Sequence, residues 1–360
     1  MKILVHICCS VDSHFFLQRL QQEYKDAILI GFFYDPNIHP YSEYYLRLLD
    51  VKRSCDILGV ELIEGEYDYL GWIEATRGLE NEPEKGARCS VCFDRRFEVS
   101  AIKAKELGCD YFTSTLLTSP KKSIEQLKIS GNELAKKYGV EFLAPDFRQK
   151  NGTQEQNIIA KEAKLYRQNY CGCLYALKQQ REQQNRLLDE LSCPLTKQIM
   201  PASIESKIKL YEKRVKLEEQ NRSYEIIKKR FLNWRLLNAK VLSKKKVIHS
   251  HFLPYSTLKR GFSRGKIDKK IANIYYFNRD EIKFIDLNLY NKLLKTNYKS
   301  VLDLANNAPS FENELNLKNK LLGEFDLSAL IVLDEVKEEK LEIILESKNF
   351  EDVEDKLILT

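Results

Sequence analysis

Lys2–Cys9 reads K-I-L-V-H-I-C-C, a short apolar run that ends in two thiols. An amphipathic stretch follows from Ser13 to Tyr24, and the next apolar run is Ala27–Tyr34, A-I-L-I-G-F-F-Y. Apolar runs of this length, separated by stretches with helical spacing, are typical of parallel strands joined by helices. The beginning of the chain therefore predicts an α/β fold.

The same alternation continues beyond these runs. Three stretches with helical spacing end at or before a glycine, and a short apolar run follows each. The predicted helices cover residues 41–58, 95–107 and 122–138, and the further strands 60–64, 111–116 and 140–143. Strands joined in this order form a parallel sheet with right-handed crossovers and helices on both faces. We therefore expect a five-stranded sheet whose chemistry lies in loops at the carboxyl ends of the strands.

Composition limits the class of protein. The chain has 360 residues, of which 43% are hydrophobic and 31% charged, so it is long enough for two domains and is not a disordered tail. No apolar run approaches the roughly 20 residues that a membrane span needs. The first residues lack the apolar core and cleavage site of a signal peptide. The sequence indicates a cytoplasmic protein.

Charge divides the chain into three segments. Residues 1–184 hold 25 Lys and Arg against 26 Asp and Glu, residues 185–300 hold 27 against 11, and residues 301–360 hold 6 against 15. We interpret these as an α/β domain, a basic extension that is mainly helical over 204–240, and an acidic C-terminal segment. The basic extension favours a polyanionic partner, with a solvated lysine-rich surface as the alternative.

Cysteine spacing points to metal. Six of the nine cysteines form three close groups, at Cys8-Cys9, Cys89-x-x-Cys92 and Cys171-Gly172-Cys173. Paired thiols chelate zinc, copper(I) or iron–sulfur clusters, and six thiolates with Asp12 exceed a single tetrahedral site. Cys55 and Cys109 stand alone, so we expect them to pack as small apolar residues. The spacing assigns neither metal binding nor packing to Cys193.

The first loop also bears on nucleotide binding. Cys8–Ser13 resembles the S-G-G-x-D-S loop of ATP pyrophosphatases, but Cys9 and Ser10 occupy the two glycine positions. Those glycines let backbone amides approach pyrophosphate. The replacement argues against ATP and for a metal at the same place.

Five motifs together resemble one family. They are H-I-C-C (6–9), G-F-F-Y-D-P-N-I-H-P-Y-x-E-Y (31–44), G-A-R-C-x-x-C-F (86–93), T-S-T-L-L-T-S-P (113–120) and Y-R-Q-x-Y-C-G-C (166–173). Over about residues 1–180 the chain resembles the epoxyqueuosine reductases of the QueH type. The resemblance implies reduction of epoxyqueuosine to queuosine at the wobble position of tRNA, the last step of queuosine biosynthesis. It also implies a cobalamin-independent reaction and a sheet similar to that of the nucleotide-α-hydrolase and ATP-pyrophosphatase group.

The same resemblance implies the cofactors and their ligands. It implies a [4Fe-4S] cluster with an adjacent iron, and metal ligands at Cys8, Cys9, Asp12, Cys89, Cys92, Cys171 and Cys173. Many relatives read C-C-x-P-C in the first loop, so Asp12 stands at the position of a third cysteine. We expect a carboxylate-ligated variant. The division of these residues between cluster and second iron stays open.

Candidate catalytic residues lie in the loop after the second strand. Removing an epoxide oxygen as water needs two electrons, two protons and an acid near the oxygen. We expect that acid among Tyr34, Asp35, His39 and Glu43, with Asn37 bonding a hydroxyl of the substrate. Tyr41, Tyr44 and Trp72 are candidates for stacking on a base.

The expected partners are tRNA and an electron donor such as ferredoxin or flavodoxin. Candidate RNA contacts are Arg88, beside the C-x-x-C pair, and Lys245, Arg260 and Arg264 in the extension. Two alternative functions remain at this point. One is an ATP-dependent tRNA thiolase, which needs the missing glycine loop, and the other is a zinc-stapled RNA-binding module without catalysis.

Overall fold

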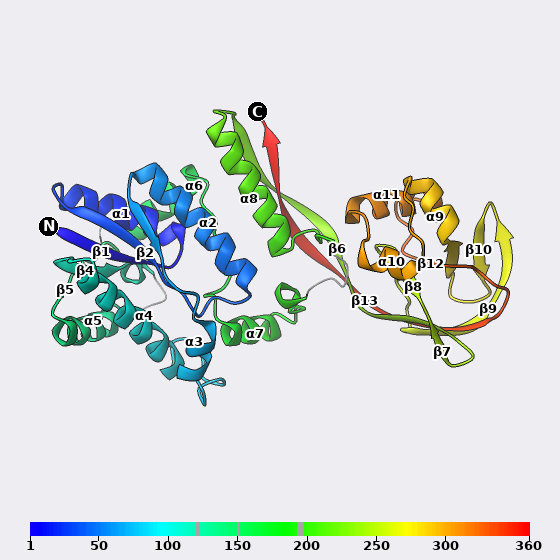
Figure 1. Cartoon of the computed structure of the whole chain (residues 1–360), viewed down its shortest axis with the longest axis horizontal. Helices are drawn as coiled ribbons and strands as arrows, with labels where there is room; N and C mark the ends of the chain where they lie inside the picture. The colour runs from blue at the N-terminus through cyan, green and yellow to red at the C-terminus, as the bar shows by residue number, and fades with distance from the viewer. Residues whose placement is uncertain (120–122, 150, 193–197) are drawn as a thin grey trace. The chain divides into compact units, whose positions relative to one another are not determined.

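The computed structural model describes residues 1–119, 123–149, 151–192 and 198–360. The end of the fourth motif at Pro120 and the isolated Cys193 lie outside these residues. Two compact units make up the chain (Figure 1). The first comprises residues 1–190, 208–226 and 359–360, and the second residues 191–207 and 227–358. Among the described residues, no helix is both long and apolar enough to cross a membrane.

A parallel sheet of five strands forms the first unit, as predicted. Its strand order is β3-β2-β1-β4-β5. The strands are β1 (Lys2–Ile7), β2 (Ile28–Phe33), β3 (Glu61–Glu64), β4 (Tyr111–Ser114) and β5 (Glu141–Phe142). The central strand β1 pairs with β2 on one side and β4 on the other. Their carboxyl ends therefore meet at one edge, next to Cys8 and Asp35.

Helices cover this sheet in two layers. α1 packs against α2, and α4 packs against α5, with the pairs on opposite faces (Figure 1). The helices of this unit are α1 (Ser10–Glu23), α2 (Tyr41–Leu58), α3 (Tyr69–Ala75), α4 (Ala87–Glu106), α5 (Ile124–Tyr138), α6 (Gly152–Glu162) and α7 (Leu174–Gln183), with short 3-10 turns η1 (Thr115–Thr118) and η2 (Asp189–Leu191). α4 begins before the predicted position at Arg95, so Cys89 and Cys92 lie on its first two turns.

The buried face of α2 carries an unusual set of side chains. The apolar strands explain the core, since Ile3, Leu4 and Phe33 are completely buried. α2 also buries Glu43, Arg47, Asp50 and Ser54, which recur every three or four residues. This spacing places them along one face of a helix. We call these four residues the polar stripe of α2.

The second unit is built on an eight-stranded sheet, so the extension is not mainly helical as predicted. Its strand order is β7-β6-β13-β9-β10-β11-β12-β8. The strands are β6 (Tyr224–Ser243), β7 (Lys246–Ile248), β8 (Ser250–Phe252), β9 (Phe262–Ile271), β10 (Ile274–Phe277), β11 (Lys283–Asp286), β12 (Leu330–Leu333) and β13 (Lys340–Leu359). Within the described part of the chain, three helices follow the hairpins: α9 (Leu287–Leu294), α10 (Val301–Asn306) and α11 (Phe311–Leu322).

The long helix expected over 204–240 divides into a helix and a strand. α8 (Ile204–Glu219) ends just before Asn221, whose φ of 52° is left-handed, and β6 starts at Tyr224. Charge alone does not distinguish a solvated helix from an exposed strand. The aromatic and β-branched residues of Y-E-I-I-K-K-R-F-L-N-W favour the strand.

The acidic C-terminal segment is part of the same sheet. β13 carries most of its strand-forming residues and lies between β6 and β9. Leu341, Ile343 and Leu345 alternate into the core of the second unit. Part of the acidic segment is therefore a central strand of the sheet.

Candidate metal centre

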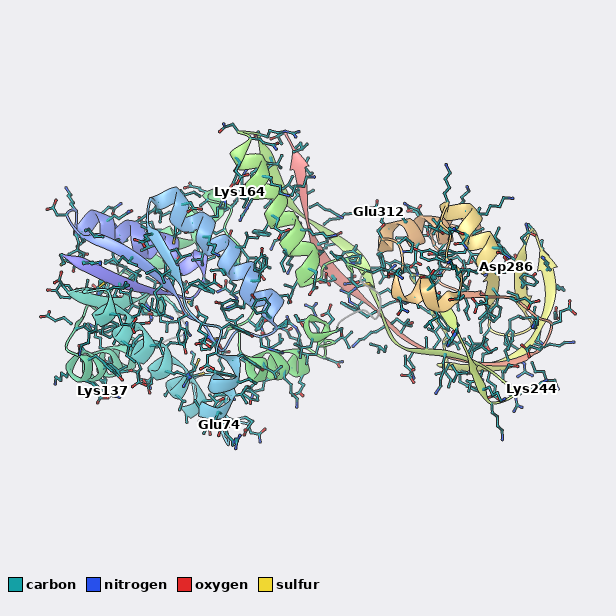
Figure 2. The ribbon with its side chains drawn as sticks, viewed as in Figure 1. Glu74, Lys137, Lys164, Lys244, Asp286 and Glu312 are labelled. Carbon is teal, nitrogen blue, oxygen red and sulfur yellow. The ribbon has the colours of Figure 1, made fainter. Side chains whose placement is uncertain are left out.

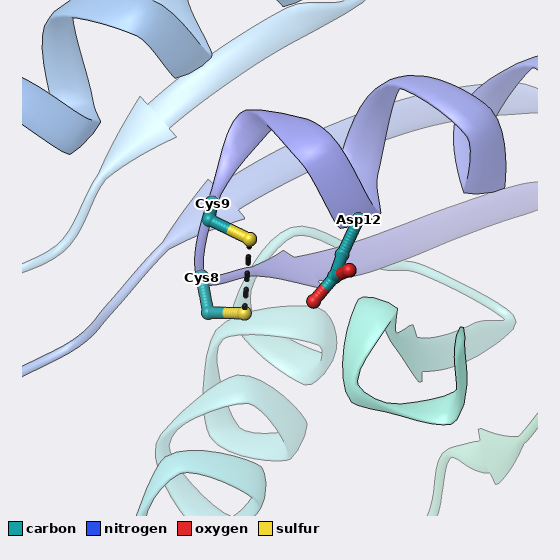
Figure 3. Close-up of side chains that lie close together, drawn as sticks. All are labelled: Cys8, Cys9 and Asp12. Carbon is teal, nitrogen blue, oxygen red and sulfur yellow. Dashed lines mark hydrogen bonds between the residues drawn. The ribbon is translucent and has the colours of Figure 1, made fainter. Parts of the chain in front are cut away.

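The first cysteine pair lies where β1 ends and α1 begins. Cys8 follows β1, and Cys9 immediately precedes the first helical residue, Ser10. The two sulfurs are 4.0 Å apart, and both lie within 4.8 Å of a carboxylate oxygen of Asp12 (Figure 3). Asp12 reaches them because it is in the first turn of α1. These three side chains can offer two sulfurs and one oxygen to a single ion.

Neighbouring groups hold this loop and its charges. Gln156 of α6 donates a hydrogen bond from Nε2 to Asp12 Oδ1 at 2.6 Å. Burial raises the pKa of Asp12, although bonds from Cys9 and Gln156 oppose the rise. Contact between the thiols lowers the pKa of Cys8 and, with burial, raises that of Cys9 well above its ordinary value. Cys8 is thus the first of the pair to ionise.

The other four cysteines surround one small pocket. Cys89 and Cys92 are three positions apart on α4 and so project from one side of the helix. Cys171 and Cys173 lie in the segment before α7, with Cys173 at its N-cap. All four line the same pocket, together with Asn37, Trp72, Glu84, Arg88, Phe93, Arg96 and Ala176.

The two groups differ in spacing. Among the described residues, Cys8, Cys9 and Asp12 form the single group of three candidate ligands whose atoms all lie within 4.8 Å. Thiolates on one tetrahedral ion, at about 2.3 Å from it, need such close sulfurs. Four cysteines spread more widely around a pocket are instead a donor set that fits an iron–sulfur cluster. The residues therefore fit one cluster and one separate ion.

A buried cation lies near both groups. Arg96 of α4 pairs with Asp35, with Nη2 2.5 Å from Oδ1, and both side chains are buried. Its guanidinium also interacts electrostatically with Cys92, Cys8 and Cys171. Burial alone would lower the pKa of Arg96, but these anionic groups outweigh it and raise the pKa. Arg96 can therefore offset negative charge on bound thiolates from all three cysteine motifs.

Asp35 is the predicted acid that lies beside Arg96 in this buried region. Burial raises the pKa of Asp35 to about 6, against the opposing charges of Arg96 and Arg47. His6 lies beside it, with Nε2 4.0 Å from Asp35 Oδ1, and its Nδ1 is 2.8 Å from Ser114 Oγ. Burial, followed by the charge of Arg96, keeps the pKa of His6 well below its ordinary value, so this imidazole is neutral.

The other predicted catalytic residues take different positions. Asn37 is buried and lines the four-cysteine pocket, and its Oδ1 has no hydrogen-bond partner among the described residues. Tyr34 stacks on Phe32, and burial raises its pKa. His39 stacks on Tyr69 at 4.7 Å between ring centroids, and burial lowers its pKa. Glu43 forms an ion pair with Arg47 within the polar stripe of α2.

Aromatic rings form a row beside these loops. The rings of Tyr41, Tyr44, Tyr67, Tyr69 and Trp72 contact one another in succession. Tyr41 is 56% exposed, whereas Tyr44 and Trp72 are buried and serve packing. Tyr67 and Tyr69 were not among the residues predicted from the sequence. Their position directly after β3, at the same sheet edge as the cysteines, was the available signal.

The predicted RNA contacts are not equally exposed. Arg88 is buried, and its Nη1 donates to the carbonyls of Leu79, Glu80 and Glu82, so it supports the loop before α4. Arg264 pairs with Glu342 on the neighbouring strand at 3.4 Å. Arg260 is exposed.

Lys244–Lys246 form an exposed basic tip at the β6–β7 hairpin (Figure 2). Lys244 and Lys245 occupy its two central positions with φ of 46° and 66°. Asparagine and glycine normally occupy such positions.

The comparisons with known proteins agree with this geometry. The family model "Epoxyqueuosine reductase QueH" matches residues 3–179. Epoxyqueuosine reductase QueH of Helicobacter pylori is 39% identical over 96% of this chain and 97% of its own. The chain belongs to the QueH family. It is an epoxyqueuosine reductase, an oxidoreductase of queuosine biosynthesis.

Other relatives match the first half alone. QueH of Histophilus somni is 37% identical over 49% of this chain and 72% of its own. The Thermotoga maritima QueH is 34% identical over 50% of this chain and 92% of its own. Among solved structures, "U34-tRNA thiolase NcsA from Methanococcus maripaludis with its [4Fe-4S] cluster" matches with a TM-score of 0.35 and 17% identity, covering 60% and 72% of the two chains. That likeness is too low to support a conclusion.

Proposed function

We propose that this QueH protein removes the epoxide oxygen of epoxyqueuosine while the base is at the wobble position of tRNA. Two electrons and two protons convert the epoxide into the carbon–carbon double bond of queuosine, and the oxygen leaves as water. The observation that carries the proposal is the meeting of three cysteine motifs at one sheet edge in a chain of this family.

The two groups of ligands support a division of the metals. Cys89, Cys92, Cys171 and Cys173 would hold the [4Fe-4S] cluster, and Cys8, Cys9 and Asp12 the adjacent iron. When bound, these metals supply electrons and a Lewis acid. Asp12 in place of a thiolate leaves this ion with a harder ligand that suits iron.

The chain's own residues would bind the base and deliver a proton. Asp35 would give the proton to the leaving oxygen, since burial raises its pKa to about 6 and so keeps part of it protonated close to neutral pH. The free Oδ1 of Asn37 would accept a hydrogen bond from a hydroxyl of the substrate. Exposed Tyr41 would stack on an unpaired base.

Two partners follow from this reaction. A small electron carrier, such as ferredoxin or flavodoxin, would supply the electrons. The basic tip Lys244–Lys246, with Arg260, would contact tRNA phosphates, as the exposure of these residues supports. Arg264 would do so only after exchanging its partner Glu342.

The deciding experiment uses full-length protein purified without oxygen and supplied with iron and sulfide. With dithionite as reductant, we expect it to convert epoxyqueuosine in tRNA to queuosine, measured by mass spectrometry of the nucleosides. Iron and acid-labile sulfide should accompany the activity. Stoichiometric zinc in place of iron after this treatment, without turnover, would overturn the proposal.

Single cysteine variants test the ligand assignment. We expect Cys89→Ala and Cys171→Ala to abolish turnover and to lower both iron and sulfide content. Cys109→Ala is the control, because Cys109 packs in the core beyond the amino end of the sheet, beside Met1 and Tyr111. Full activity in either paired variant would contradict the assignment.

Asp12 tests the separate ion. Asp12→Ala should lower iron content without removing sulfide, while Asp12→Cys should keep the iron and change its absorption spectrum, since thiolate replaces carboxylate. Asp12 is not a ligand if Asp12→Ala matches the unchanged protein in iron content, spectrum and rate.

A further inference from the structure

A residue of the C-terminal extension reaches the polar stripe of α2. Arg214 of α8 forms an ion pair from Nη2 to Oδ1 of Asp50, and both side chains are fully buried. Its Nη1 also donates to the carbonyl of Lys164 at 2.7 Å, and its guanidinium lies 4.2 Å from the centre of the Tyr211 ring. Both partners belong to the first unit, which includes residues 208–226.

Asp50 in turn binds two of the three segments that carry paired cysteines. Its Oδ2 accepts a hydrogen bond from Ser10 Oγ, directly after Cys9, and another from the backbone N–H of Tyr166 at 2.6 Å. Tyr166 opens the segment that leads to Cys171 and Cys173. One carboxylate, with Arg214 on its other oxygen, therefore fixes the start of α1 and this segment together.

Arg47 and Glu43 of the polar stripe of α2 also bind the segment that leads to Cys171 and Cys173. Arg47 donates from Nη1 to the carbonyl of Cys171 and from Nη2 to that of Tyr170, each at 3.0 Å. Glu43 accepts from Arg47 and from the hydroxyl of Tyr166. Asp50 is thus the position at which the stripe binds the Cys8–Asp12 loop as well.

A buried carboxylate needs a compensating cation. Without Arg214, Asp50 would either keep its charge without a direct ion-pair partner or take up a proton. A protonated Asp50 would be a weaker acceptor for the hydrogen bonds from Ser10 and Tyr166, and a charged one would draw water toward Ser10. Either change would loosen the backbone that places Cys9.

We propose that Arg214 is a positioning residue for the metal centre, acting through Asp50 and Ser10 on the Cys8–Asp12 loop. This role rests on the proposed metal site and adds to it a residue outside the segment matched by the family model, residues 3–179. In this chain the extension would thus complete the reductase unit.

Thiol labelling tests the proposal without depending on activity. Full-length protein is freed of metal with a chelator and labelled with iodoacetamide. After digestion, mass spectrometry follows two peptides. Peptide 3–19 contains Cys8 and Cys9, so its double labelling requires reaction of Cys9, and labelling of peptide 54–77 reports reaction of Cys55. Cys9 is 2% exposed and Cys55 is completely buried, so both should react slowly in the unchanged protein.

Arg214→Met should raise the rate of double labelling at least about tenfold and leave Cys55 unchanged. Arg214→Lys should restore part of the protection. Combining Arg214→Met with Asp50→Asn should also restore part, because the neutral amide removes the uncompensated charge and still accepts one hydrogen bond. In protein purified without oxygen, iron per chain should fall in Arg214→Met. It should recover in part in Arg214→Lys and in the variant that combines Arg214→Met with Asp50→Asn.

The matched control is Glu218→Gln. Glu218 also joins α8 to α2, through Arg53, but this pair does not contact the cysteine loop. The Glu218→Gln variant should leave Cys9 protected and the iron content unchanged.

Two results would overturn the positioning role. One is equal protection of Cys9 in Arg214→Met and the unchanged protein. The other is simultaneous exposure of Cys9 and Cys55, which would mean that Arg214 stabilises the whole unit. If the unchanged protein holds no iron while Arg214→Met still exposes Cys9, the metal assignment fails and the positioning of the loop stands.

Discussion

At the scale of single residues, charge buried beside the cysteines governs what the site can do. Asp35 is enclosed by Arg96 and His6, and desolvation of its carboxylate outweighs the nearby cations. Its protonated form is therefore populated close to neutral pH, whereas His6 stays neutral. A carboxyl group that can carry a proton thus lies beside a fixed positive charge near the cysteines.

This arrangement predicts a pH dependence. Because Asp35 must be protonated to donate, turnover should be greatest below about pH 6 and fall as pH rises through that value. Asp35→Asn should lower the rate roughly 100-fold or more and remove the alkaline limb. Single-turnover rates with pre-reduced enzyme, from pH 5 to about 8, measure both effects. His39→Gln is the comparison, and it should keep the limb.

At the scale of elements, the sequence predicted the strands and helices whose burial is one-sided or complete. The bounds of β1 and α2 agree with prediction, because their apolar patterns and the glycine after α2 are unambiguous. The early start of α4 was missed, since its first turn is held by Arg88 and by cysteines rather than by an apolar stripe. β6 was taken for helix because its exposed lysines obscure the strand pattern.

The sequence also predicted one part of the candidate site and missed another. Close spacing along the chain was enough to group the six paired cysteines. Asp50, Arg214 and Gln156 were not found, because their partners are far away in the sequence and only folding brings them together. Arg88 was predicted to contact RNA, but it is buried and donates to three backbone carbonyls. No sequence motif indicates these contacts.

The β6–β7 hairpin offers a test in which stability and binding change in opposite directions. Lys244→Asn with Lys245→Gly supplies residues suited to left-handed positions and removes two charges. The free energy of unfolding should rise by about 1 kcal/mol, while tRNA binding weakens and its salt slope falls by roughly 1.5. Chemical denaturation and binding at several salt concentrations measure the two effects.

The β9–β10 hairpin provides the control. Ala272 and Asn273 are also left-handed, with φ of 48° and 69°. Ala272→Asn with Asn273→Gly should stabilise the protein without altering the salt slope. Equal slopes for the two hairpin variants would rule out phosphate contact by Lys244 and Lys245.

At the scale of the whole molecule, the boundary between the units does not follow the segments of charge. Residues 208–226 lie within the basic segment but belong to the first unit, where Arg214 and Glu218 bind α2. The acidic segment, in turn, supplies two strands of the second unit. Cutting the chain by composition would therefore damage both units.

Two truncated chains test whether α8 belongs to the first unit. A chain ending at residue 184 should be less stable, because it lacks Arg214 and Glu218, the ion-pair partners of Asp50 and Arg53 on α2. A chain ending at residue 226 should retain the stability of the first unit and its iron. Urea unfolding followed by circular dichroism compares the two, and equal midpoints would contradict the assignment of α8 to this unit.

The central place of β13 has a consequence for synthesis on the ribosome. Its partners β6 and β9 emerge long before it, yet the sheet between them cannot close until β13 has left the exit tunnel. During that interval the edges of β6 and β9 are unpaired, and strand pairing over such long separations is slow. The five-stranded sheet, complete by residue 142, can fold first. Nascent chains should therefore pass through a state with a folded reductase sheet and an open second unit, and this state is the one that needs a chaperone.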